Sequence, residues 1–157
     1  MKQCGRSRHD ARMRETVSEL EGIRDRIKQL TQAGVVTRHE LACGYRTLYR
    51  GVFVRRDAEI SLRDRAIGAW LATGRQGVIA GVAASALHGA PWVDPEQPVE
   101  VAGVKRRPQP GLILRGEHIP ADELTRVGGL PVTTRVRTAF DLGRHLERVE
   151  ALERLTR

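Results

Sequence analysis

Apolar residues recur at helical spacing along the first part of the chain. The steps of three and four residues place them on one face of a helix, with arginine, aspartate, glutamate and lysine on the opposite face. The pattern predicts a helix over residues 13–30 that packs against a core or a second helix. Residues 1–12 are basic and lack the pattern, so we expect a disordered arm there. The apolar positions are Met13, Val17, Leu20, Ile23, Ile27 and Leu30.

A second, short helix is predicted by the stretch AGVVTRHELACG. Thr37 is followed three residues later by Glu40, as in a capping box, and Val36 and Leu41 match the hydrophobic staple. Gly44 stands where a glycine commonly ends a helix. Two helices joined by a glycine-containing turn form a helix-turn-helix outline. The second helix is shorter than a typical recognition helix.

The next stretch, YRTLYRGVFVRR (45–56), predicts a strand hairpin. Val52 and Val54 favour strands, and Gly51 permits a bend or bulge. A hairpin directly after a helix-turn-helix is the wing of a winged helix. Tyr45 and Tyr49 are expected mainly to pack rather than to stack on bases.

From residue 61 onward short helices and strands alternate. Ser61 with Asp64 predicts the start of a helix that ends at Gly74. The stretch GVIAG is a short buried strand or a tight turn. VAASALHG (82–89) is a helix of small residues, and His88 is expected at its C-terminal end, where the helix dipole favours a histidine ring.

The remainder predicts strands and one last helix. PVEVAG (98–103) alternates like a strand, and after the basic turn KRRPQPG the stretch LILR (112–115) is expected as the returning strand. ELTRVGGLPVTT reads as two strands joined at Gly128–Gly129. Thr133 or Thr134 caps the final helix, in which Asp141 is expected to pair with Arg137 or Arg144.

The final helix carries apolar residues to the end of the printed sequence without a stop signal. We expect this stripe either to dimerise or to reflect a chain cut short relative to a longer architecture. Its apolar residues are Val136, Phe140, Leu146, Val149, Leu152 and Leu155.

The composition favours an acidic partner. Lys and Arg number 27 against 19 Asp and Glu, for a net charge of +8 and a pI near 10.6, as is typical of nucleic-acid-binding domains. Aromatic residues make up only 4%, which disfavours RNA recognition by base stacking. Two cysteines, Cys4 and Cys43, predict neither a disulfide framework nor a metal site.

No catalytic motif, signal peptide or membrane-length apolar run is apparent in the sequence. We therefore expect a cytoplasmic protein that is not an enzyme and that needs no cofactor or metal.

Two groups of residues are candidates for contact with DNA. The alternative for each is a solvated surface, which is the usual state of a basic turn such as the second group. The start of the second helix would meet base edges, and the hairpin arginines would meet phosphates. This group comprises Thr37, Arg38, His39, Arg46, Arg50, Arg55 and Arg56. The second group, in a proline-bounded turn, would contact a nucleic-acid backbone or RNA, and comprises Lys105, Arg106 and Arg107.

Several pieces of the chain resemble a known family. GVF after the helix-turn-helix, GVIAGVAASALHGAPW, PVEV and TRVGGLPVTTRVRTAFDLGR are similar to the AbiEi antitoxin of type IV toxin–antitoxin systems, from about residue 20 onward. The likeness is to the actinobacterial branch, in which this part often precedes a Vsr-like nuclease domain. The acidic and lysine residues of that nuclease domain are absent here, so the resemblance carries over no cleavage activity.

The resemblance implies an α+β fold in which a winged helix-turn-helix (13–58) precedes a small mixed α/β antitoxin-type domain (59–157). It implies binding to double-stranded operator repeats of its own operon, for which a homodimer or paired monomers would be suited. It also implies action against a nucleotidyltransferase toxin without a stable complex. The alternatives are a truncated member of the nuclease-fused family, kept as a non-catalytic interaction or DNA-binding module, and an RNA-binding module.

Overall fold

The computed structural model describes residues 43–91 and 93–146, and this part of the chain is α+β, with three α-helices and two sheets. The chain divides into two compact units, residues 1–59 and 60–157. The expected arm, the helix over 13–30 and the helix that bears Thr37, Arg38 and His39 lie outside the described residues. So do the apolar positions Val149, Leu152 and Leu155.

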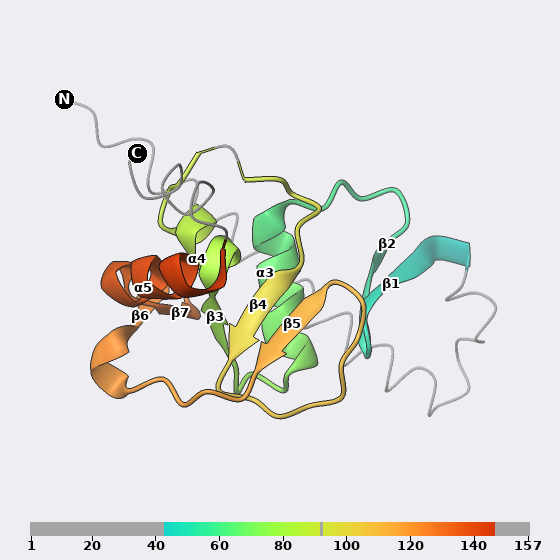
Figure 1. Ribbon diagram of the computed structural model, residues 1–157. Coiled ribbons are helices and arrows are strands. Elements are labelled where there is room, and N and C mark those ends of the chain that lie inside the picture. Colours follow the sequence, from blue (N-terminus) through green and yellow to red (C-terminus); the bar gives the residue numbers. More distant parts are fainter. Residues whose placement is uncertain (1–42, 92, 147–157) are drawn as a thin grey trace. The chain divides into compact units, whose positions relative to one another are not determined.

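In the first unit, an antiparallel hairpin follows the helical residues Cys43 and Gly44 (Figure 1). Its strands are β1 (Tyr45–Tyr49) and β2 (Val52–Arg55). Gly51 lies in the turn with a φ of 77°, which an L-residue rarely adopts. The hairpin predicted for this stretch is therefore confirmed. One side of it is buried, through Tyr49, Val52 and Val54.

The second unit begins with α3 (Leu62–Ala72), which starts where Ser61 and Asp64 predicted a helix start and has a capping box there. The Asp64 backbone N–H donates to the Ser61 hydroxyl at 3.2 Å, and the Ser61 backbone N–H donates to the Asp64 carboxylate at 3.0 Å. These two bonds satisfy donors that a helix start leaves unpaired. The helix buries Ala66, Ile67, Ala69 and Leu71.

The end of α3 is a Schellman motif. The Arg75 N–H donates to the Trp70 carbonyl at 2.9 Å, and the Gly74 N–H donates to the Leu71 carbonyl at 3.0 Å. Gly74 and Arg75 are both left-handed, with φ of 73° and 64°. The Arg75 guanidinium lies 5.9 Å from the centroid of the Trp70 ring, in place of the apolar contact that usually completes this motif. The helix thus stops just before Gly74, the glycine at which it was predicted to end.

A five-stranded mixed sheet forms the rest of the second unit (Figure 1). Its order is β5-β4-β3-β7-β6. The central strand β3 is antiparallel to β4 and parallel to β7, and β6 and β7 form the hairpin predicted around Gly128–Gly129. The strand bounds are Val78–Ala80 (β3), Val99–Ala102 (β4), Leu112–Arg115 (β5), Leu124–Val127 (β6) and Leu130–Thr133 (β7).

The direction of β5 corrects the sequence-based expectation. The strand lies where it was predicted, but it runs parallel to β4, not back along it. The connection over residues 103–111 is too long for a tight hairpin turn, and it takes the chain back along the length of β4 before β5 begins (Figure 1). A turn in which the Leu112 N–H donates to the Gln109 carbonyl at 3.2 Å then starts the strand.

Two further helices complete the unit. α4 (Gly81–Leu87) follows β3 with no intervening residue and is capped at its C-terminus by His88, as predicted. α5 (Arg135–His145) is capped by Thr134, whose hydroxyl accepts from the Arg137 backbone N–H at 3.3 Å. Both α3 and α4 pack on β3 and β4, and α4 also packs on α5. No helix in the described residues is long and apolar enough to cross a membrane.

The two faces of the sheet are buried differently. Alternation along the strands places one apolar set on each face. One set is almost fully buried and consists of Ile79, Val99, Val101 and Val132. The other is a smaller cluster against which Leu124 packs, and consists of Val78, Ala80, Ala102 and Ile119.

Candidate functional site

The four candidate arginines of the hairpin are all exposed, but they do not form one row. Arg46 is paired in register with Val54, and Arg55 with Tyr45, so the two arginines lie on opposite faces of the ribbon. Arg50 is in the turn, and Arg56 follows β2 at the open end. A nucleic acid in contact with one face of the hairpin would meet some of these cations and not others.

Arg55 is already paired with a carboxylate. Its Nε and Nη2 donate to the two oxygens of Asp57 at 3.0 and 2.8 Å. This hydrogen bonding lowers the pKa of the Asp57 carboxyl. A phosphate that binds Arg55 would have to displace Asp57 from this bidentate contact.

The second candidate group lies in the connection between β4 and β5, and all three of its side chains are exposed. The Arg106 Nη2 atom lies 3.0 Å from the position that a Cβ on Gly74 would occupy. Arg106 therefore lies at the C-terminal end of α3, where the helix dipole favours a cation. The Lys105 stem lies 3.3 Å from the equivalent position on Gly116. The structure thus brings Arg106 to Gly74 at the end of α3. Arg75, the next residue, is also exposed and was not among the cations predicted as candidates.

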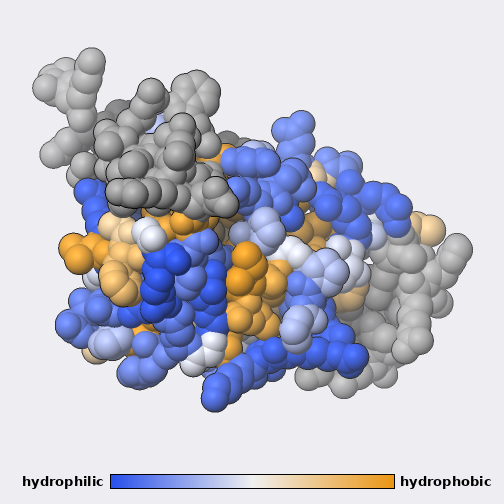
Figure 2. Space-filling view, in the orientation of Figure 1, coloured by the Kyte–Doolittle hydropathy of each residue, from blue (hydrophilic) through white to orange (hydrophobic). Residues whose placement is uncertain are grey.

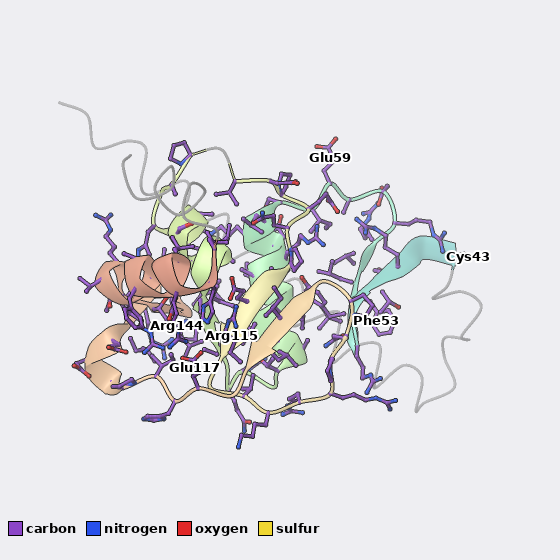
Figure 3. The ribbon with its side chains drawn as sticks, viewed as in Figure 1. Cys43, Phe53, Glu59, Arg115, Glu117 and Arg144 are labelled. Atoms are coloured by element: carbon purple, nitrogen blue, oxygen red, sulfur yellow. The ribbon has the colours of Figure 1, made fainter. Side chains whose placement is uncertain are left out.

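α5 is tied to the rest of its unit by Arg137. The Arg137 Nε donates to Asp141 at 3.0 Å, Nη2 donates to Glu117 at 3.0 Å, and Nη1 donates to Glu123. The predicted pair between Arg137 and Asp141 is confirmed, whereas Arg144 pairs with Glu117 and not with Asp141. Figure 3 shows Glu117 and Arg144 where the segment after β5 passes α5.

Each charged side chain in this network is bonded to a side chain of opposite charge. Burial alone would lower the pKa of the Arg137 guanidinium, but its bonds to Glu123 and Asp141 outweigh burial and raise that pKa. The hydrogen bond from Arg144 lowers the pKa of the Glu117 carboxyl. These groups therefore remain charged at neutral pH and act as cross-links.

A second internal ion pair joins the parallel strands β4 and β5. The Arg115 Nε donates to Glu100 at 2.7 Å, and the Glu100 side chain is only 8% exposed. The Glu100 carboxylate lies directly against Gly81, where φ is 58° and a Cβ would collide with it. Glycine at this position is needed both for the backbone conformation and for the space.

His88 links α4 to the sheet. Its Nε2 lies 2.8 Å from the Thr133 carbonyl oxygen, and because a carbonyl only accepts, Nε2 carries the hydrogen. Thr133 also shares a hydrogen bond with Thr138 of α5 at 2.8 Å. These contacts assign His88 a structural role.

Within residues 43–91 and 93–146, no group of three or more histidine, cysteine or acidic side chains could hold a metal ion. The exposed side chains of this part include the cations of the hairpin and of the connection between β4 and β5, and Val136 and Phe140 of α5. Such features suit contact with a macromolecule.

Comparison with known proteins gives one finding. A family model described as the AbiEi antitoxin C-terminal domain matches residues 10–157. No curated protein and no solved structure gives a significant match.

Proposed function

The chain belongs to the AbiEi antitoxin family, and from that premise we propose that it is a DNA-binding antitoxin that represses its own operon. In this proposal residues 13–58 form a winged helix-turn-helix on operator repeats, and residues 59–157 counter a nucleotidyltransferase toxin without forming a stable complex with it. Two copies would occupy inverted repeats.

The observation that carries the DNA-binding part is the hairpin with its exposed arginines. A two-stranded ribbon that displays cations in its turn and at its edges can meet the phosphates beside a groove that a neighbouring helix enters. Thr37, Arg38 and His39 are proposed to meet base edges in that groove. The net charge of +8 adds a general attraction to DNA.

The second basic group adds candidate DNA contacts to those of the hairpin. Lys105, Arg106 and Arg107 are exposed, and Arg106 lies beside Gly74 at the end of α3. We propose that these three cations contact the phosphate backbone, which would strengthen binding without reading sequence.

The test is binding of the purified chain to a labelled duplex from upstream of its own gene, with a scrambled duplex of equal length. We expect the upstream duplex to bind more tightly, and binding to weaken steeply with salt. Because each neutralised phosphate contributes about 0.9 to the slope of log K against log salt, R46A should reduce that slope by about 1. R126A, which removes an exposed cation of β6, is the matched control.

Two further variants separate recognition of the base sequence from contact with the phosphate backbone. R38A should reduce the preference for the upstream duplex over the scrambled one by about 1–3 kcal/mol. D57N releases Arg55 from its carboxylate and should raise affinity for both duplexes. Equal binding of the two duplexes by the unmodified chain, or binding of neither at low salt, would overturn operator recognition.

The alternative of a retained interaction module has one observation in its favour, the exposed apolar side chains of α5. The genes beside this one discriminate between the two functions. A neighbouring nucleotidyltransferase gene supports the antitoxin, and a nuclease-like segment encoded downstream of this sequence supports the truncated module.

A further inference from the structure

α5 carries two apolar side chains on its outer side, and we call Val136 and Phe140 the outer face of α5. Val136 is 82% exposed and Phe140 is 58% exposed, and because they are four residues apart they lie together on one side of the helix. The buried side carries Thr138, Asp141 and Leu142. A surface helix normally shows the reverse arrangement. Figure 2 shows apolar surface over α5, with hydrophilic surface next to it.

Polar contacts on the inner side of α5 fix this orientation. Arg137 is bonded to three carboxylates, and the Thr138 hydroxyl bonds the Thr133 hydroxyl at 2.8 Å. Rotation of α5 to bury Phe140 would break these contacts. Any cover for the outer face must therefore come to the helix from elsewhere.

The cations beside the Phe140 ring already have partners. The Arg144 guanidinium lies 5.4 Å from the ring centroid, and that of Arg137 lies 5.9 Å from it. Arg144 is bonded to Glu117, and Arg137 to its three carboxylates. Because these two charges are paired, they give the outer face no special affinity for an acidic surface or a nucleic acid. The face therefore fits an apolar occupant.

The chain can change direction at the end of α5. The Leu146 N–H still donates to the Leu142 carbonyl at 3.0 Å, but the Leu146 backbone is extended, with a ψ of 157°. The helix therefore does not continue in a straight line into the residues that follow.

The sequence after Leu146 has an apolar stripe of its own. Residues 147–157, which lie outside the described residues, contain Val149, Leu152 and Leu155 among glutamates and arginines. Their spacing of three predicts one apolar side of a helix. Eleven residues of helix span about 16 Å, which equals the length of the eleven-residue α5. The segment is therefore long enough to run back along α5.

We infer that residues 147–157 turn back at Leu146 and cover the outer face of α5. Antiparallel helices are commonly joined by two to five residues. A turn of that length places Leu152 and Leu155 beside Phe140 and Val136. Each apolar stripe then covers the other, and neither is left in water.

A second copy of the chain suits the outer face less well than this segment. Two apolar side chains bury far less than the roughly 1,000 Å² expected of a stable interface between separate chains. Residue 147 follows α5 by only two positions, so the segment is held beside the face at a high effective concentration. The inference does not depend on the proposed function.

The first test measures thermal unfolding of the full chain in three variants. V136S/F140S removes the apolar side chains of the outer face, L152S/L155S removes those of the segment, and the third variant combines all four changes. E150S/R154S, on the polar side of the predicted helix, is the matched control for substitution within the segment.

We expect V136S/F140S and L152S/L155S each to lower the unfolding temperature by about 4–8 °C, because each exposes apolar surface that the other stripe had covered. The combined variant should lose clearly less than the sum of the two, since the stripes contact each other. E150S/R154S should shift the temperature by less than about 2 °C.

The second test is a cross-link, which does not require V136S/F140S to fold. Cys4 and Cys43 are first replaced by serine, and F140C is then combined with L152C. Oxidation should join the two new cysteines within one chain, with the solution mass unchanged. F140C with R154C, on the opposite side of the predicted helix, is the control and should cross-link much more slowly.

Several outcomes would overturn the inference. An unchanged unfolding temperature in V136S/F140S would show that nothing covers the outer face. Additive losses in the combined variant would show that residues 147–157 cover a different surface. A disulfide between two chains, with a doubled mass, would assign the outer face to a second copy. Equal cross-linking of the R154C control would show that the segment has no fixed position on α5.

Discussion

Arginine plays different parts in the hairpin and in the sheet-and-helix unit that follows it. In the hairpin, Arg46, Arg50 and Arg56 are exposed, and Arg55 pairs with Asp57 where both side chains are more than 60% exposed. In the following unit, the Arg137 side chain is 11% exposed and is bonded to three carboxylates. The same charge serves as a solvated group in one region and as a cross-link in the other.

The difference between the two roles of arginine follows from how far each side chain is exposed to solvent. An exposed ion pair contributes little to stability because water screens it, whereas loss of one partner from a buried pair leaves an uncompensated charge. An exposed cation such as Arg46 can therefore bind a partner at little cost to the folding of the hairpin. Arg115 and Arg137 are not available to a partner in this way. Arg115 holds β5 to β4, and Arg137 holds α5 to the segment between β5 and β6.

The largest expected effect that tests this contrast is on folding stability. R137A leaves Glu117, Glu123 and Asp141 without their shared cation and should lower the free energy of unfolding by about 3–5 kcal/mol. R46A should change it by no more than about 0.5 kcal/mol. Urea unfolding followed by circular dichroism measures both. Equal losses in the two variants would remove the distinction between the regions.

The next largest expected effect compares substitutions at two glycines that both have a positive φ. Gly51 of the hairpin turn has a φ of 77° and open space around its Cα, whereas Gly81 has a φ of 58° and lies against the Glu100 carboxylate. G51A should cost about 1–2 kcal/mol for the left-handed backbone alone. G81A adds the displacement of Glu100 from Arg115 and should cost about 2–4 kcal/mol. Thermal unfolding of both variants would test this order, and a larger loss for G51A would contradict it.

The smallest expected effect is on the pH dependence of stability. The Glu117 carboxyl has a pKa below its ordinary value of 4.5, so its pairing stabilises the folded chain above that value and is lost as the pH falls through the lowered pKa. E117Q should therefore lose less stability than the unmodified chain when acidified below about pH 4.5.

D57N is the control for this titration. Asp57 also has a lowered pKa, but its partner Arg55 is only two residues away and both side chains are mostly exposed, so the pair does not join separate elements. Urea unfolding at a series of acidic pH values should give the same curve for D57N as for the unmodified chain. A flattened curve for D57N would show that the hairpin pair also supports the fold.

Local signals predicted most of the described elements. Ser61 with Asp64, Gly74, the Gly128–Gly129 pair and Thr134 each act within a few residues, so the sequence alone places these boundaries. The end of α5 was not predicted: the helix was expected to continue through Leu146, but it ends at His145 and Leu146 is extended. The Arg137–Asp141 pair could be predicted for the same reason, since four residues form one helical turn.

The features that were not predicted depend on contacts distant in sequence. Glu117 and Glu123 lie 20 and 14 residues from Arg137, and Glu100 meets Arg115 only because β5 runs parallel to β4. Helical periodicity identified Val136 and Phe140 as one stripe, yet polar anchors on the other side of α5 decided that this stripe faces solvent. For the candidate site, the sequence supplied the hairpin arginines but not their division between two faces.

The parallel pairing of β3 with β7 also governs how the second unit is assembled during synthesis. β3 is complete at Ala80, but β7, the strand that pairs with its other edge, begins only at Leu130, about fifty residues later. At about 5–20 residues per second this leaves an interval of roughly 3–10 seconds. During it one edge of the central strand has no neighbour and is open to pairing with another chain. The hairpin of residues 45–55, whose strands are adjacent in sequence, can close well before this unit matures.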